Sequence, residues 1–187
     1  MYFSNAITIA ASALALCGTV AASPAPAVGP QARAAAKSFC PNKEDDVDTG
    51  RRLNLFKQFN TLLFSGSQTP ANVAAAFAQY VSPNLIEHTA SANSYGADVG
   101  FLTALFPTVD ITIIPGLQDC FPTNENTNKG ICAIHYKATP KPGVQSFITN
   151  TTVISDFYKY DGVCITEHWD STQTANAATT NPGFPGA

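Results

Sequence analysis

The fold of this chain is decided by one stretch, Gly162-Val163-Cys164-Ile165-Thr166-Glu167-His168-Trp169-Asp170, which reads as a β-strand with ionisable side chains at its end. Successive side chains of a strand point to opposite faces. Alternation therefore predicts two sets, one on each face: Cys164, Thr166, His168 and Asp170, against Val163, Ile165, Glu167 and Trp169. Whichever face is buried carries an acid, and burying an unpaired carboxylate is costly. The pattern predicts a strand that lines a pocket with polar groups.

The segments before this strand divide into helices and then strands. Apolar residues recur at helical spacing in three ranges, 52–64, 71–80 and 97–106, with Asp48-Thr49 and Thr69-Pro70 as N-terminal caps of the first two. A short strand is expected at 85–89, and period-two alternation predicts longer strands at 109–117, 131–138 and 145–160. Helices followed by a strand meander predict an α+β domain, in which three helices pack on one face of a curved, largely antiparallel sheet.

The two ends of the chain are expected to lie outside the folded domain. Residues 1–22 resemble a signal peptide, because an apolar run precedes the small residues Val20-Ala21-Ala22. An Ala/Pro-rich leader over 23–39, a domain over 40–173 and a disordered tail over 174–187 complete the expected organisation. The apolar run is shorter than the roughly 20 residues of a membrane span. We therefore expect a secreted, extracellular protein without membrane attachment after cleavage; a retained N-terminal anchor is the alternative.

The charge of the chain bears on its partners. Charged residues make up 12% of the sequence and the formal net charge is −3, whereas nucleic-acid binding needs a basic surface. The composition argues against nucleic acid as a partner. It suits a protein that handles a small neutral or apolar molecule.

The cysteines predict disulfides. Cys17 leaves with the signal peptide, and the remaining four allow three pairings. Cys120 and Cys132 bracket a turn-rich segment between two expected strands, which favours Cys120–Cys132 and leaves Cys40–Cys164. A metal site is the rival interpretation, but the chain has no C-x-x-C pair, and an exported protein meets an oxidising compartment.

One N-glycosylation sequon is present, Asn150-Thr151-Thr152. It falls inside the strand expected at 145–160. Modification therefore requires Asn150 to face solvent or to lie at a bulge.

Three motifs together resemble the SnoaL-like polyketide cyclase family, within the nuclear transport factor 2-like superfamily. They are Tyr80-Val81-Ser82-Pro83-Asn84-Leu85-Ile86-Glu87-His88 followed by Gly96, Ile131-Cys132-Ala133-Ile134-His135, and the hairpin from Asp156 to Asp170 with Gln173 after it. The resemblance implies a cone, in which a strongly bent sheet wraps around helices and opens into an apolar cavity. It also implies that Asp170 is the acid/base residue. The chain departs from the family at Thr89-Ala90, where asparagine-proline is usual, and in its cysteines and export signal.

All three histidines of the chain fall in these motifs: His88, His135 and His168. Together with Asp170 they suggest proton transfer without a cofactor. Asp170, partly desolvated, would remove a proton next to a carbonyl group, and His168 lies two residues away on the same predicted face. His88 or His135 would donate a hydrogen bond to the carbonyl oxygen as the enolate forms. The alternative is that Asp170 only caps or ion-pairs the end of the strand.

The sequence leaves several functional classes open. The first is a cyclase, dehydratase or isomerase acting on a small carbonyl compound, and the second is a secreted binding protein for a small apolar ligand. A homodimer formed through the open side of the sheet is a third possibility. Three histidines and an aspartate could satisfy zinc, but no helical i, i+4 pair supports this, so neither metal nor cofactor is predicted. An enzyme requires Asp170 and at least one histidine to point into the same cavity.

Overall fold

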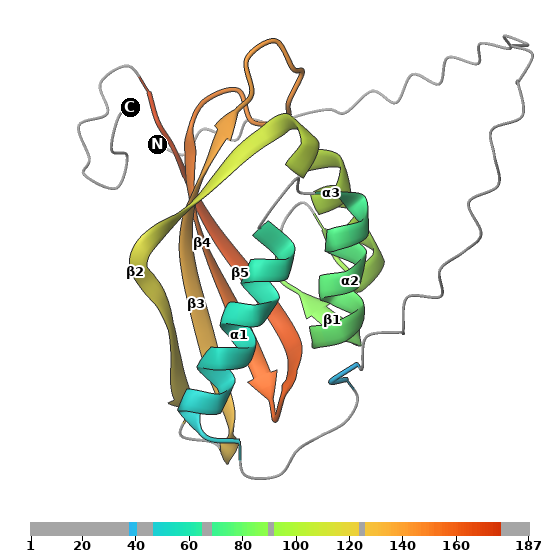
Figure 1. Ribbon diagram of the computed structural model, residues 1–187, viewed down its shortest axis with the longest axis vertical. Helices are drawn as coiled ribbons and strands as arrows, with labels where there is room; N and C mark the ends of the chain where they lie inside the picture. The colour runs from blue at the N-terminus through green and yellow to red at the C-terminus, as the bar shows by residue number, and fades with distance from the viewer. Residues whose placement is uncertain (1–37, 41–46, 65–68, 90–91, 124–125, 177–187) are drawn as a thin grey trace, which may run out of the picture. The chain divides into compact units, whose positions relative to one another are not determined.

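The computed structural model describes residues 38–40, 47–64, 69–89, 92–123 and 126–176 (Figure 1). The predicted signal peptide, nearly all of the leader and residues 177–187 of the predicted tail lie outside the described residues. Thr174, which the sequence assigned to the tail, belongs to the last strand and pairs with Thr152. Within the described part, no helix combines the length and the apolar character needed to cross a membrane.

Three α-helices are present, α1 (Thr49–Phe64), α2 (Pro70–Tyr80) and α3 (Tyr95–Leu105), and a short 3₁₀ turn η1 (Phe106–Thr108) follows α3. The predicted caps form: the Asp48 carboxylate accepts a hydrogen bond from the Arg51 N–H at 2.6 Å. The Thr69 hydroxyl accepts one from the Asn72 N–H at the start of α2. Each cap satisfies a backbone donor that a helix leaves open at its first turn.

The five strands form one sheet in the order β1-β5-β4-β3-β2. Their bounds are β1 (Val81–Glu87), β2 (Val109–Thr123), β3 (Asn126–Pro140), β4 (Thr152–Asp161) and β5 (Cys164–Thr174). Strand β1 pairs with β5 in parallel, and the other pairs are antiparallel. The sheet is mixed, curved and not closed, and its concave side carries the helices (Figure 1). The predicted α+β class is confirmed.

The strand predicted at 145–160 begins later than expected. Residues 145–151 form an irregular loop between β3 and β4. Side-chain contacts replace the strand ladder there, because the Ser146 hydroxyl lies 2.8 Å from the Thr108 hydroxyl and also accepts from the Ile148 N–H at 3.2 Å. The alternation of apolar and polar residues in the sequence could not show that side-chain hydrogen bonds replace strand pairing in this segment.

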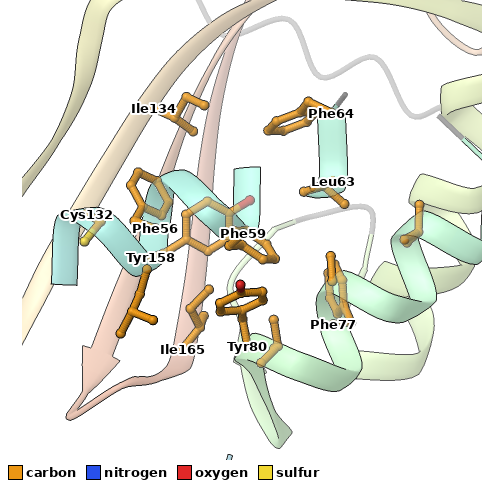
Figure 2. Packing of buried hydrophobic residues seen from close by; sticks show 14 of the residues in the cluster. Phe56, Phe59, Leu63, Phe64, Phe77, Tyr80, Cys132, Ile134, Tyr158 and Ile165 are labelled. Carbon is orange, nitrogen blue, oxygen red and sulfur yellow. The ribbon is translucent and has the colours of Figure 1, made fainter. Parts of the chain in front are cut away.

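The core lies between α1, α2 and the inner face of the sheet. Phe59 of α1 packs edge-on against Tyr158 of β4 with ring centroids 5.4 Å apart, and Phe56 lies 5.6 Å from the same ring. Phe77 and Tyr80 of α2 close the other side of Phe59 (Figure 2). Aromatic pairs of this kind add about 0.5–1.5 kcal/mol each beyond the area that they bury. The cluster fixes α1 over β4.

Strand β5 contains a bulge that corrects the simple alternation. Tyr160 of β4 is opposite Ile165, but Lys159 is opposite Glu167, so Thr166 is an extra residue in β5. A bulge shifts the side-chain phase of the strand by one residue. Ile165 therefore faces the core while His168 also faces inward, onto the ring of Tyr158. The prediction that these two side chains lie on opposite faces was wrong.

Two disulfides are formed, Cys120–Cys132 and Cys40–Cys164. This is the pairing that the spacing of the cysteines favoured. Cys120 and Cys132 are direct partners in the β2–β3 ladder. Cys40 joins the segment before α1 to the start of β5, next to the backbone bond from the Phe39 N–H to the Gln79 carbonyl.

Candidate functional site

A cavity of about 280 Å³ lies between α3, the loop 141–151 and the inner face of β3, β4 and β5. Its walls are largely apolar and aromatic: Leu63, Phe64, Phe101, Leu102, Leu105, Phe147, Ile148 and Ile154. Its polar lining includes three aspartates, two tyrosines and one histidine: Asp98, Asp156, Asp170, Tyr136, Tyr158 and His168. A largely apolar pocket with a few convergent ionisable groups is typical of a small-molecule site.

His168 is held between two carboxylates at the wall of this cavity. Its Nδ1 lies 2.8 Å from Glu87 Oε2, and its Nε2 lies 3.7 Å from Asp156 Oδ1. The parallel register of β1 and β5 sets the first contact, because Glu87 is directly opposite His168. The imidazole also stacks on the ring of Tyr158, with centroids 4.5 Å apart.

These contacts keep His168 protonated. Burial by itself lowers the pKa of His168, but the contacts with Asp156 and Glu87 outweigh it and raise the pKa from 6.5 to about 10. At neutral pH the side chain is therefore an imidazolium, which can donate but cannot accept a proton. Its Nε2 makes no hydrogen bond within the described residues, so this donor is available at the wall of the cavity.

Asp156 organises the inner end of the cavity. It lies on β4, opposite Asp170 of β5, and its Oδ2 accepts the hydroxyl of Tyr158 at 3.2 Å. Burial first and the nearby Asp156 charge second raise the pKa of both Tyr136 and Tyr158 well above 10. Both tyrosines therefore stay neutral hydrogen-bond donors.

Asp98 of α3 is a buried carboxyl group, 5% exposed. Burial raises the pKa of Asp98 from 3.8 to about 7; the positive charge of His168 opposes this rise, and the charge of Glu87 and a hydrogen bond with it add to it. A group with a pKa near 7 can give or take a proton at neutral pH. Asp98 is thus a chemically competent member of the site.

Asp170 lies further along β5, at the exposed end of the cavity wall. Burial and the charge of Asp156 raise the pKa of Asp170, and the charge of His168 partly offsets them. Its carboxylate is a stronger base than a fully solvated aspartate would be. Asp170 and His168, which the sequence predicted to act together, line the same cavity.

The other two predicted histidines lie on the opposite face of the sheet. His88 stacks on Trp169 with ring centroids 4.5 Å apart, and its Nε2 lies 3.2 Å from Glu167 Oε2. His135 contacts the Ser155 hydroxyl through Nδ1 at 3.3 Å and lines a separate surface depression. Neither His88 nor His135 lines the cavity with Asp170.

The sequence interpretation missed Glu87, Asp98 and Asp156. Two of them carried a signal of the kind that identified Asp170. Asp98 is the one charged residue within the apolar helix Tyr95–Leu105, and Asp156 interrupts the inward series of β4 that continues with the buried Tyr158 and Tyr160. A lone acid in an apolar element needs a partner or a function.

The same groups could hold a cation. Single ligand atoms of Glu87, Asp98 and His168 all lie within 4.8 Å of one another. His168 would first have to release the proton that its raised pKa retains, because a metal binds the neutral imidazole. The arrangement therefore suits proton transfer and charge stabilisation better than metal ligation.

No protein-family model matches the sequence, and no curated protein matches it. Among solved structures, the chain is similar to TsrD from Streptomyces laurentii, with 9% identity, a TM-score of 0.45, and coverage of 68% of this chain and 92% of that one. It is also similar to a provisionally assigned polyketide cyclase from Acidithiobacillus ferrooxidans, with 17% identity, a TM-score of 0.41, and coverage of 65% and 88%. A third similar structure is a provisionally assigned SnoaL-like polyketide cyclase from Jannaschia, with 9% identity, a TM-score of 0.42, and coverage of 70% of this chain and 91% of that one.

Proposed function

We propose that this chain is a secreted, cofactor-free acid/base enzyme of the cyclase, dehydratase or isomerase type, acting on a small carbonyl compound. The observation that carries the proposal is the presence of Asp170 and His168 on the wall of one cavity. Their position in one cavity supports a mechanism in which a base and a histidine act on the same bound molecule. The two disulfides are compatible with an extracellular location.

His168 acts on the carbonyl oxygen in this proposal. Its Nε2 is buried and has no hydrogen-bond partner in the part of the chain that the structure describes, and the contacts with Asp156 and Glu87 raise its pKa to about 10. A fixed imidazolium donor stabilises the negative charge that develops on oxygen when an enolate forms. His168 therefore serves as the electrophilic group and not as the base.

Asp170 is the base that removes the proton next to the carbonyl. Its pKa is raised by burial and by Asp156, which brings its basicity closer to that needed for transfer from carbon. In a dehydration, Asp170 takes the carbon-bound proton, and a proton from solvent goes to the departing hydroxyl. The substrate then loses one water molecule, and Asp170 returns its proton to solvent.

The size and lining of the cavity restrict the substrate. A volume of about 280 Å³ lies at the lower end of the range for small-molecule sites. Phe64, Phe101 and Phe147 supply aromatic surface on the side facing α3 and the loop 141–151. A compact, mostly apolar molecule with one reactive carbonyl fits these walls.

The test is a panel of small β-hydroxy ketones, with dehydration followed by ultraviolet absorbance of the enone. We expect Asp170→Asn and His168→Gln to lower kcat/KM at least about 100-fold, the usual contribution of a general base or an oxyanion donor. His135→Gln is the matched control, because His135 lies outside the cavity, and it should retain wild-type activity. Thermal unfolding of each variant separates lost chemistry from lost folding.

Two outcomes would contradict the proposal. One is equal activity in folded Asp170→Asn and wild type. The other is tight binding of apolar ligands by the wild type without turnover of any compound, which would assign the cavity to a secreted binding protein.

A further inference from the structure

The wall of the cavity carries more carboxyl groups than cationic groups. Asp98, Asp156 and Asp170 come from α3, β4 and β5 and all line it. Among the described lining residues there is no lysine or arginine, and His168 supplies the positive charge. Asp98 and Asp156 are buried, whereas Asp170 is exposed. A buried carboxylate needs a proton or a cation to offset its lost hydration.

The positive charge of His168 is already paired with the carboxylates of Glu87 and Asp156. Its Nδ1 hydrogen-bonds Glu87 at 2.8 Å, and the Glu87 side chain is fully buried. Asp156 accepts a hydrogen bond from the Tyr158 hydroxyl, and its Oδ1 lies 3.7 Å from His168 Nε2. Within the described residues, Asp98 and Asp170 form no ion pair with a basic side chain of the chain itself. Asp98 is the buried one of the two. It hydrogen-bonds Glu87, and the positive charge of His168 acts on it, but within the described residues no cation lies at ion-pair distance from it, which leaves that position to a ligand.

The rest of the lining suits a cationic ligand with a hydrocarbon body. Aromatic faces attract cations through their electron-rich rings, and the cavity is lined by Phe64, Phe101, Phe147, Tyr136 and Tyr158. Two of these residues, Phe101 and Phe147, stack on each other with centroids 6.3 Å apart, where α3 meets the loop 141–151.

An independent observation favours a hydrogen-bond acceptor on the same ligand, because His168 Nε2 lies 3.7 Å from Asp156 Oδ1, beyond hydrogen-bond distance. His168 is 6% exposed and lines the cavity, yet its Nε2 has no hydrogen-bond partner within the described residues. A buried donor left unpaired costs about 1–3 kcal/mol. An oxygen atom of a bound molecule would remove this cost.

We propose that the substrate of this cavity carries a protonated amine together with a hydroxyl or carbonyl oxygen. The ammonium group faces Asp98, the oxygen accepts from His168 Nε2, and the hydrocarbon portion packs on the aromatic walls. This inference rests on the proposed function to the extent that it concerns the same cavity. It adds the chemical class of the substrate, an amino ketone, which an amino alcohol can mimic in binding without reacting.

The test is calorimetric binding of three probes that differ in one terminal group: 3-amino-1-phenylpropan-1-ol, 1-phenylpropane-1,3-diol and 3-hydroxy-3-phenylpropanoate. We expect the amine to bind at least about tenfold more tightly than the diol, and the carboxylate to bind more weakly than either, because only the amine complements the acidic wall. The double variant Asp98→Asn/Asp170→Asn should bind amine and diol equally. Asp110→Asn, which removes an exposed aspartate on β2 outside the cavity, is the control and should keep the preference.

Equal affinity of amine and diol for the wild type would overturn the inference, as would an unchanged amine preference in the folded double variant. Tight binding of Mn²⁺ or Zn²⁺ alone that displaces the amine would also overturn it, in favour of a metal at Glu87, Asp98 and His168. Binding is read without turnover, so the two proposals fail separately. If the protein turns over neutral hydroxy ketones but shows no preference for the amine in binding, only the amine inference is wrong. If it prefers the amine but turns over no compound, only the proposed enzymatic function is wrong.

Discussion

Glu87 Oε2 and His168 Nδ1 lie 2.8 Å apart although 81 residues separate them in the chain. The contact spans the parallel pair β1–β5, where the two residues are register partners. It gives a buried imidazolium a buried carboxylate, and Asp156 adds a second one on the other side of the ring. The charge state of the cavity therefore depends on a residue that does not itself line it.

Replacement of Glu87 by glutamine tests this dependence. The contacts with Asp156 and Glu87 hold the pKa of His168 at about 10 against the opposing effect of burial, so removal of one carboxylate should lower it. Folded Glu87→Gln should show His168 titrating at lower pH than in the wild type, as measured by NMR of the imidazole nitrogens. The chain has three histidines, and His135 serves as the internal control. An unchanged titration of His168 would contradict the role given to Glu87.

Asp98 predicts a pH dependence of stability with a definite sign. Its pKa rises on folding from 3.8 to about 7 because of burial, so the protonated acid is the form that the fold favours. This contribution is complete below pH 3.8 and is lost as the pH rises through about 7. Asp98→Asn keeps a neutral hydrogen-bond donor at this position at every pH. The variant should therefore not lose this contribution to stability as the pH rises.

Urea unfolding of wild type and Asp98→Asn between pH 4 and pH 8 measures the effect. The free energy of unfolding of the variant, relative to the wild type, should increase across this interval and level off near pH 8. Each unit of pKa shift corresponds to about 1.4 kcal/mol, so the total change should be a few kcal/mol. Parallel pH curves for the two proteins would show that Asp98 ionises as easily in the fold as in the unfolded chain.

Gly130 of β3 is predicted to be intolerant of a side chain. A Cβ there would lie 2.5 Å from Arg52 Nη1 and 2.8 Å from the Phe121 carbonyl oxygen. Arg52 is fully buried and donates from Nη2 to the Val47 carbonyl at 3.1 Å, so it has no room to move aside. Gly130→Ala should lower the free energy of unfolding by about 1–3 kcal/mol, as overpacking usually does.

Gly100 supplies the matched control for this substitution. It lies within α3, and a Cβ there would meet nothing within 4 Å. Gly100→Ala should be neutral or stabilise the protein by about 0.5–1 kcal/mol, because alanine favours the helix. Denaturant unfolding of the two variants under the same conditions gives both numbers, and equal effects would refute the packing argument at Gly130.

Asn150 is predicted to carry an N-linked glycan when the chain passes through a eukaryotic secretory pathway. The residue is exposed in the loop before β4, and not within the strand where the sequence placed it. Mass spectrometry of the secreted protein should detect a glycan mass that glycosidase removes and that Asn150→Gln abolishes. Asn84→Gln, at an exposed asparagine of β1 outside any sequon, should keep it. Secretion of an unmodified wild-type chain would contradict the prediction.

The fold class could be predicted because its signals are local. Helical spacing and caps located α1, α2 and α3, and alternation located four of the strands, each with shifted ends. The parallel pairing of β1 with β5 has no local signal, since it joins residues about half the chain apart. The bulge at Thr166 is also invisible to a strict alternation of two, which is why the face of Ile165 was predicted wrongly.

The candidate site was only partly accessible for the same reason. Asp170 and His168 are two residues apart on one strand, so their common face follows from alternation. His88 and His135 were counted with them through their positions in the motifs. In the structure their strand neighbours, Glu87 and Ile134, face inward and leave both histidines on the outer side. Asp98 and Asp156 join the site through tertiary packing, which no single segment encodes.

The disulfide between Cys40 and Cys164 closes a covalent ring, since 124 positions separate the two residues. The second disulfide, Cys120–Cys132, lies inside this ring. An endopeptidase that cuts the exposed loop 141–151 would therefore release no fragment, because both pieces stay joined through Cys164. A nicked molecule would gain only the mass of the water added in the cleavage until a reductant opens the ring, and the strand that carries His168 and Asp170 would stay attached to the helices. Outside the cell, where peptidases are common and reductants are scarce, such a ring would keep the residues of the site in one molecule after the backbone is cut.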